Sequence, residues 1–99
     1  MRYLTLIPDY TNSCLQDDFE GYLQLSELKL SHNLLDSLKK WHEEYKKIIP
    51  LPIEQRNKIM DQINNLDRDG LKLAKQISKE IPGGAKVKYF SEGQLKYIN

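Results

Sequence analysis

The segment Asn65-Leu-Asp-Arg-Asp-Gly70 has the oxygen-bearing side chains from which calcium loops are built. Oxygens recur at its first, third and fifth positions, and a glycine stands sixth, as in loops that wrap a calcium ion. The twelfth position, however, is Gln76, where such a loop needs a glutamate. Apolar residues also continue through the segment at helical spacing. We therefore interpret it as a solvated helix face and predict no metal site.

The remaining side chains that often ligate metals or carry catalysis are two histidines and one cysteine. His32 and His42 lie on one predicted helix, about 15 Å apart along its axis at ~1.5 Å per residue, which is too far to share a metal. Cys14 stands in a predicted loop, with no second cysteine and no neighbouring histidine to act as a base. The sequence predicts no catalytic residue and no cofactor.

The composition describes a small, nearly neutral chain. Its 99 residues are enough for one domain, and 15 Lys+Arg against 14 Asp+Glu give a net charge of +1. This balance argues against direct binding to nucleic acid or to an anionic membrane. A single cysteine excludes an internal disulfide, and no export signal or apolar membrane span is evident. We expect one domain over residues 1–99 in the cytoplasm.

The charges are unevenly distributed along the chain. Residues 1–30 carry five acidic and two basic side chains, a balance of −3, whereas residues 31–81 and 82–99 each carry +2. An acidic region with interleaved aromatic residues suits a basic protein partner, because aromatic rings supply contact area and carboxylates steer association. An equally good interpretation is that the acids only solubilise this region. The candidate partner-binding residues are Asp9, Tyr10, Asp17, Asp18, Glu20 and Tyr22.

Three segments have the pattern of strands. Residues 2–7 are apolar on both faces and end at Pro8, which predicts a strand in the middle of a sheet. Residues 19–25 alternate, with Phe19 on the half-buried face. Residues 85–90 alternate between lysines and apolar residues, which predicts an edge strand. The tail, residues 93–99, either adds a short strand or packs loosely.

Two amphipathic helices are predicted between the second and third strands. The first begins at Ser31, a suitable N-cap, and its apolar stripe includes Trp41 and Tyr45 before Pro50 ends it. The second spans residues 52–81, and its length suggests a break near Asn64–Gly70. The predicted fold is α+β: a small, mainly antiparallel three-stranded sheet in the order β-β-α-α-β, with two long helices packed on one face.

Several short motifs together resemble a family of small bacterial immunity proteins. They are Asp9-Tyr10 after the first strand, Gly21, Leu30-Ser31, Trp41 with Tyr45, Asp69-Gly70-Leu-Lys-Leu-Ala74, Pro82-Gly83 and Val87-Lys-Tyr89. The family protects bacteria in polymorphic toxin systems, including contact-dependent growth inhibition. The resemblance implies a non-catalytic protein that binds the C-terminal toxin domain of a cell-surface effector, often a nuclease, and blocks its active site or its access to substrate. It implies no small-molecule substrate.

Two alternatives remain open on the residues alone. The first is a different non-catalytic binding module, either an interaction adaptor or a homodimer that pairs through the predicted edge strand at Val87–Phe90. A less favoured alternative is a small hydrolase that uses Asp9 or Asp17 with a histidine, which requires a concave pocket around a perturbed titratable group.

Overall fold

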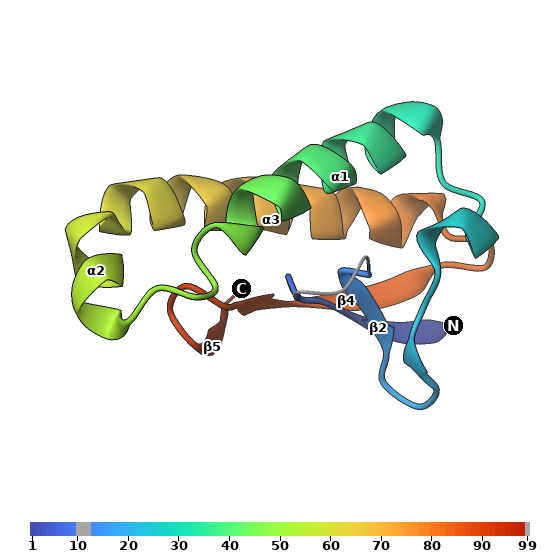
Figure 1. Cartoon of the computed structure of the whole chain (residues 1–99). Coiled ribbons are helices and arrows are strands. Elements are labelled where there is room, and N and C mark those ends of the chain that lie inside the picture. Colours follow the sequence, from blue (N-terminus) through green and yellow to red (C-terminus); the bar gives the residue numbers. More distant parts are fainter. Residues whose placement is uncertain (10–12, 99) are drawn as a thin grey trace.

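A single mixed sheet forms the base of the molecule (Figure 1). The computed structural model describes residues 1–9 and 13–98, and within them the strand order is β3-β2-β1-β4-β5. The strands are β1 (Arg2–Leu6), β2 (Leu15–Asp17), β3 (Gly21–Tyr22), β4 (Ala85–Ser91) and β5 (Lys96–Ile98). The helices are the 3₁₀ turn η1 (Leu25–Glu27), α1 (His32–Lys46), α2 (Ile53–Lys58) and α3 (Met60–Glu80).

The class α+β is confirmed, but the predicted three-stranded, mainly antiparallel sheet is wrong. The two longest strands, β1 and β4, pair in parallel, with Leu4 opposite Val87 and Leu6 opposite Tyr89. A parallel pair needs a long crossover connection, and the helices supply it. The other three strands have only two or three residues each, so they are too short to show an alternating pattern in the sequence.

The predicted strand at residues 19–25 is wrong in its position. The chain forms β2 earlier, turns at residues 18–20, and continues into β3. Asp17 causes this turn, because its Oδ1 accepts the backbone N–H groups of Phe19 (2.8 Å) and Glu20 (3.1 Å). Phe19 therefore stands at the tip of a hairpin with 83% of its surface exposed.

The first helix agrees with the prediction at its start. Ser31 is the N-cap of α1, and its Oγ accepts the N–H of Leu34 at 3.2 Å. The predicted break in the second helix lies elsewhere. The chain bends at Ile59, where φ is −120°, between the short α2 and the long α3. Residues 64–70 continue without interruption inside α3.

The C-terminal tail adds a strand, β5, which pairs antiparallel with β4. Consequently β4 has a partner on each side, and the prediction that Val87–Phe90 forms an edge strand is wrong. Among the described residues, β5 already occupies that edge of β4 at Tyr89–Ser91, so a homodimer that pairs there would have to displace β5. Among the described residues, the two edges of the sheet are the short strands β3 and β5.

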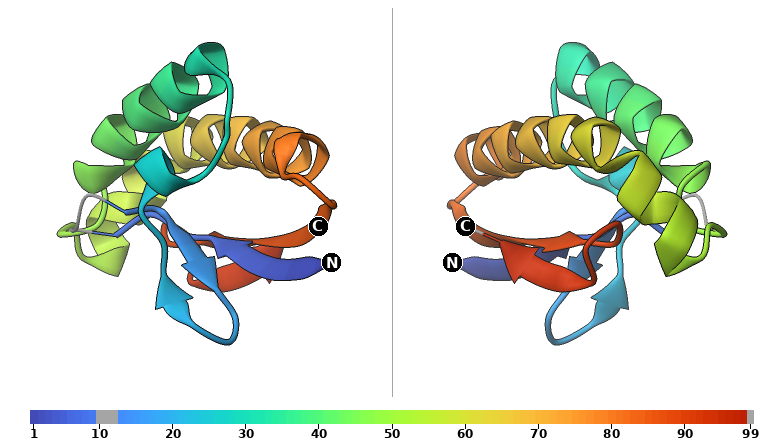
Figure 2. Two further views of the ribbon diagram at one scale, coloured as in Figure 1. Left: turned by 90° about the vertical axis from the view of Figure 1, so that its right-hand side faces the viewer. Right: turned by 90° about the vertical axis from the view of Figure 1, so that its left-hand side faces the viewer.

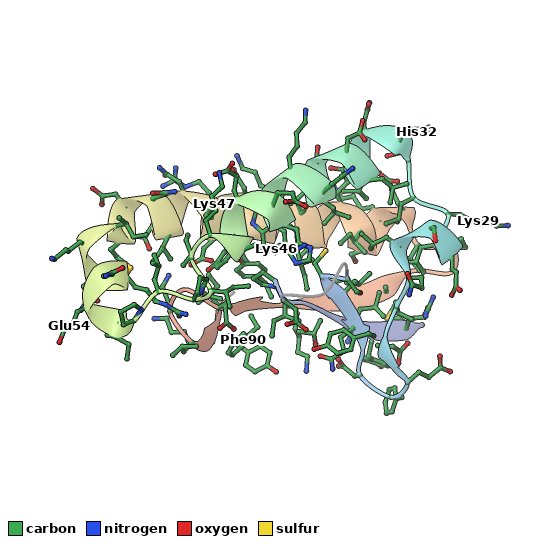
Figure 3. The ribbon with its side chains drawn as sticks, in the orientation of Figure 1. Lys29, His32, Lys46, Lys47, Glu54 and Phe90 are labelled. Atoms are coloured by element: carbon green, nitrogen blue, oxygen red, sulfur yellow. The ribbon has the colours of Figure 1, made fainter. Side chains whose placement is uncertain are left out.

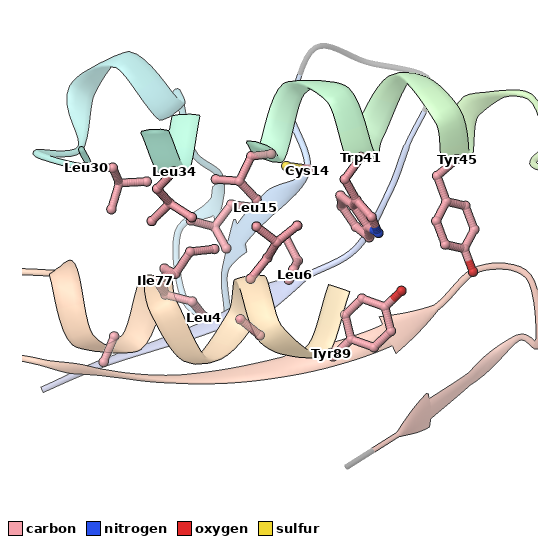
Figure 4. Close-up of a cluster of buried hydrophobic side chains, with 14 of the residues drawn as sticks. Leu4, Leu6, Cys14, Leu15, Leu30, Leu34, Trp41, Tyr45, Ile77 and Tyr89 are labelled. Atoms are coloured by element: carbon pink, nitrogen blue, oxygen red, sulfur yellow. The ribbon is translucent and has the colours of Figure 1, made fainter. Parts of the chain in front are cut away.

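The helices lie on one side of the sheet, and the core fills the space between them (Figure 2). Leu4, Leu6 and Leu15 from the sheet pack against Leu34 and the other core residues of the helices (Figure 4). Within residues 1–9 and 13–98, no helix or strand covers the opposite side of the sheet. None of the helices described is long and apolar enough to cross a membrane.

Candidate functional site

The acidic hairpin between β2 and β3 has one inward-facing and two outward-facing acids. Asp17 is buried, and its carboxylate also pairs with Arg2 at 3.4 Å. The hydrogen bond from the N–H of Phe19, followed by those from Glu20 and Arg2, lowers the pKa of Asp17 below its ordinary value. Asp17 therefore closes the hairpin, and little of its carboxylate is left for a partner.

Asp18 and Glu20 are more accessible than Asp17. Asp18 accepts a hydrogen bond from the Thr5 hydroxyl at 2.8 Å and forms an ion pair with Lys88 at 3.3 Å. Glu20 is exposed, and its carboxylate forms no ion pair with any residue that the structure describes. Between them Phe19 lies with its ring edge-on to Tyr3, the centroids 6.2 Å apart. The hairpin thus presents negative charge next to an exposed aromatic pair.

Asp9 and Tyr22 meet at the other end of the hairpin. A side-chain hydrogen bond to Asp9 raises the pKa of the Tyr22 hydroxyl, and Tyr22 as a whole residue is 56% exposed. The backbone of Asp9 contacts His42 of α1, as described below. Tyr10 lies outside the described residues. The structure therefore gathers four of the predicted residues around the accessible side of β2 and β3: Asp9, Asp18, Glu20 and Tyr22.

These residues continue into a larger surface that we call the open face. It is the side of the sheet that faces away from the helices, because side chains alternate along each strand and Leu4, Leu6 and Tyr89 point into the core. The strand register identifies its members: Tyr3, Thr5, Gln16, Asp18, Tyr22, Lys86, Lys88, Phe90 and Tyr97. Figure 3 shows Phe90 projecting on this side.

Sequence reasoning missed the C-terminal half of the open face. Tyr97 packs edge-on against Phe90 with ring centroids 5.0 Å apart, and the Lys88 ammonium lies 5.3 Å from the centre of the Tyr97 ring. Lys88 also pairs with Asp18, so it connects this aromatic cluster to the acidic hairpin. The alternation of lysines along residues 85–90 indicates that they share one face of the strand. No pattern in residues 93–99 predicts that Tyr97 joins them on that face.

His42 and Cys14, the two side chains with catalytic potential nearest this region, are both buried. The Nε2 atom of His42 lies 2.6 Å from the backbone oxygen of Asp9, and desolvation lowers the pKa of the imidazole. Burial raises the pKa of the Cys14 thiol to about 12, so the thiol is protonated at neutral pH. His42 thus contacts the main chain of Asp9 and anchors the segment after β1 to α1.

A buried polar cluster around Asp67 lies under the β4–β5 turn. The Asp67 carboxyl accepts hydrogen bonds from four side chains at 2.6–2.8 Å: Tyr45, Tyr89, Ser91 and Gln94. Figure 4 shows the two tyrosines reaching toward each other from α1 and β4. Asp67 is only 2% exposed, so its side chain belongs to the core. In the described part of the chain, no group of three or more His, Cys, Asp and Glu side chains is arranged to hold a metal ion.

Arg56 of α2 also holds the β4–β5 turn in place. Its guanidinium donates hydrogen bonds to the backbone oxygens of Leu51 (2.8 Å), Ile49 (2.7 Å) and Glu92 (2.6 Å). The α1–α2 connection and the β4–β5 turn are therefore tied together by one buried side chain. Sequence reasoning missed both Arg56 and Asp67, because charged residues on helices are usually solvated.

The chain matches the model of the Serratia CdiI immunity protein-like family over residues 2–92. The chain belongs to this family. The match covers the acidic hairpin, the helices and β4, and it confirms the resemblance to immunity proteins of contact-dependent growth inhibition. Membership in the CdiI-like family supports toxin neutralisation in such a system and implies that a cognate toxin protein is the partner. No curated protein matches the chain.

Proposed function

We propose that the chain binds the C-terminal toxin domain of an effector delivered by neighbouring bacteria and neutralises it in the cytoplasm. The toxin domain is a nuclease, and the bound immunity protein covers its active site or its path for substrate. The CdiI-like match over residues 2–92 carries this proposal, because it spans nearly the whole fold. In this proposal the chain has no catalytic activity, needs no cofactor, and binds neither nucleic acid, membrane nor a small-molecule substrate.

The acidic hairpin supports a nuclease as the target. Nuclease clefts are basic because they bind phosphates, so an exposed carboxylate such as that of Glu20 can occupy the place of a phosphate. Asp18 adds a second negative charge, and exposed Phe19 and Tyr22 add aromatic contact area. Complementary charge also speeds the capture of an incoming toxin, and salt weakens this effect.

Co-expression tests the function itself. The toxin domain encoded beside this chain is induced in cells with and without the chain, and growth is followed. The proposal predicts survival only with the chain, together with a 1:1 complex on purification. Death of cells that contain folded chain would reject the proposed function. Nuclease activity of the free toxin, lost in the complex, supports the proposed target, whereas a toxin without nuclease activity would refute it.

A charge variant tests the predicted contact residues. Asp18→Asn combined with Glu20→Lys leaves the buried Asp17 in place and should lower the association rate about tenfold or more at low salt. The matched control is Asp61→Asn with Glu54→Lys, which makes the same charge change on exposed positions of the helices. Equal association rates for the two double variants would show that the acidic hairpin does not guide the toxin.

A further inference from the structure

The open face has features that the fold alone does not need. Of the large apolar side chains exposed in the described residues, Tyr3, Tyr22 and Tyr97 lie on it, and Phe19 packs against Tyr3. The solvated side of a sheet is ordinarily polar, with apolar residues reserved for the core side. Exposed aromatic residues that contact no core residue point instead to a surface that a partner covers.

The C-terminal half of this face is held rigidly from beneath. The β4–β5 turn is fixed by Gln94 and Ser91, which bond Asp67, and by the backbone oxygen of Glu92, which accepts from Arg56. A turn held at three points presents the following strand, and with it Tyr97, in one orientation. Rigid aromatic side chains lose little conformational freedom on binding and make good interface anchors.

The charges on the open face and in the adjoining β2–β3 turn form two groups. Acidic Asp18 and Glu20 lie at the β2–β3 end, whereas Lys86 and Lys88 lie on β4. Lys88 and Asp18 compensate each other through their ion pair. Glu20 and Lys86 form no ion pair with a residue that the structure describes, so each is available to a group of opposite sign on a partner.

We propose that the toxin domain seats on the open face as a whole, with Tyr97 and Tyr3 as its aromatic anchors and Lys86 as a second charged contact. This inference rests on the toxin-binding function proposed above and extends it beyond the acidic hairpin. The matching toxin surface is bipolar: basic opposite Glu20, acidic opposite Lys86, and apolar between them. Tyr97 lies outside residues 2–92, so this anchor belongs to the part of the chain that the family match does not include.

The near-neutral charge of the chain favours a protein as the occupant. A sheet face with aromatic residues and lysines also suits single-stranded nucleic acid, on which bases stack. Nucleic-acid binding, however, relies on a net basic surface to neutralise phosphates, and here Asp18 pairs with Lys88 while Glu20 adds a further negative charge in the adjoining turn.

Binding measurements with the purified toxin domain test the proposal. Tyr97→Ala should weaken the complex at least tenfold, mainly through faster dissociation, because Tyr97 is 60% exposed and its loss leaves the core intact. Ile53→Ala, which removes an exposed apolar side chain from α2, should change the affinity less than twofold. Lys86→Glu should slow association with the toxin. Lys75→Glu, at an exposed position of α3, should leave the association rate unchanged.

Thermal melting of each variant shows whether it is folded, and Tyr3→Ala gives a second anchor should Tyr97→Ala be unstable. If Tyr97→Ala, Tyr3→Ala and Lys86→Glu all bind toxin like the parent chain while the parent still protects cells, the open face is not the interface and the proposed function stands. Saturable binding of a single-stranded RNA oligonucleotide, lost in Tyr97→Ala, would also overturn the inference by assigning the face to nucleic acid.

Discussion

Tyrosine and acidic side chains lie on both sides of the sheet, but those on the side covered by the helices are buried and those on and beside the open face are exposed. On the covered side, Tyr89 and Asp67 are buried and every polar atom of that cluster has a partner. On and beside the open face, Tyr97 and Glu20 are exposed, and neither belongs to the buried core. The comparison separates residues that hold the structure from residues available to a toxin. Substitutions on the covered side should change the free energy of unfolding, and those on the open face should change binding.

The largest effect on stability is expected at Asp67. Asp67→Ala removes the acceptor of four hydrogen bonds and should lower the free energy of unfolding by about 5 kcal/mol, since a buried donor left without a partner costs about 1–3 kcal/mol. Chemical denaturation measures this. The control is Asp69→Ala, an exposed acid two residues away, which should stay within about 0.5 kcal/mol. Equal effects at the two positions would refute the buried cluster.

Trp41 tests the packing between the helices and the sheet. Its ring is buried against Tyr45 and Tyr89, and its Nε1 donates to the Leu66 oxygen at 2.9 Å. Trp41→Ala should therefore destabilise the protein by about 3–5 kcal/mol. An unshifted melting curve for this variant would show that the stripe of α1 faces another direction. Lys40→Ala, exposed on the same helix, is the control.

A smaller effect on the free energy of unfolding is expected at Gly70, where the test is whether alanine stabilises or destabilises the protein. Replacing glycine by alanine in an exposed helix interior normally stabilises by about 1 kcal/mol. Here a Cβ on Gly70 would overlap Cε1 of Tyr89, so the ring, whose hydroxyl donates to Asp67, would have to shift. Gly70→Ala should destabilise by about 1–3 kcal/mol. A stabilised Gly70→Ala variant, measured by denaturation, would mean that Tyr89 does not rest against α3.

The smallest effect is the pH dependence due to His42. Desolvation holds the pKa of His42 below its ordinary 6.5, so the unfolded chain takes up a proton at a higher pH than the folded chain does. The contribution of His42 to the free energy of unfolding should be fully present above pH 6.5. It should be lost as the pH falls through the lower pKa that His42 has in the folded chain. Glu92 has a raised pKa and acts in the opposite direction at more acidic pH.

Chemical denaturation at several pH values between 7.5 and 5.5 measures how steeply the free energy of unfolding changes with pH, which is the slope in question. His42→Asn removes the titrating group and should flatten it, whereas His32→Asn, at the exposed start of α1, should leave it unchanged. A slope that survives in His42→Asn would assign the pH dependence to another group.

Long elements were predictable from the sequence, and short ones were not. The stripe from Leu34 to Tyr45 and the cap at Ser31 identified α1, because helical periodicity accumulates over several turns. By contrast, β2 has three residues and its turn depends on hydrogen bonds to Asp17, which no alternating pattern records. The parallel pairing of β1 with β4 likewise depends on where the helices return the chain to the sheet.

The candidate site was predictable only in part. The excess of acidic residues located the hairpin, but it did not distinguish the buried Asp17 from the exposed Glu20. Asp67 had a signal that was not used: it lies four residues after Ile63 and three before Gly70, on the buried stripe of α3. Tyr97 had none, because its place beside Phe90 arises from the pairing of β5 with β4.

If the toxin covers the open face, the helices on the other side of the sheet stay exposed in the complex. Lysine acetylation of the free chain and of the complex, read by mass spectrometry, tests it directly, because Lys86 lies on the open face and Lys40 and Lys75 are exposed on α1 and α3. We predict that toxin protects Lys86 and leaves Lys40 and Lys75 as reactive as in the free chain. Protection of Lys40 and Lys75 with an unchanged Lys86 would contradict the claim.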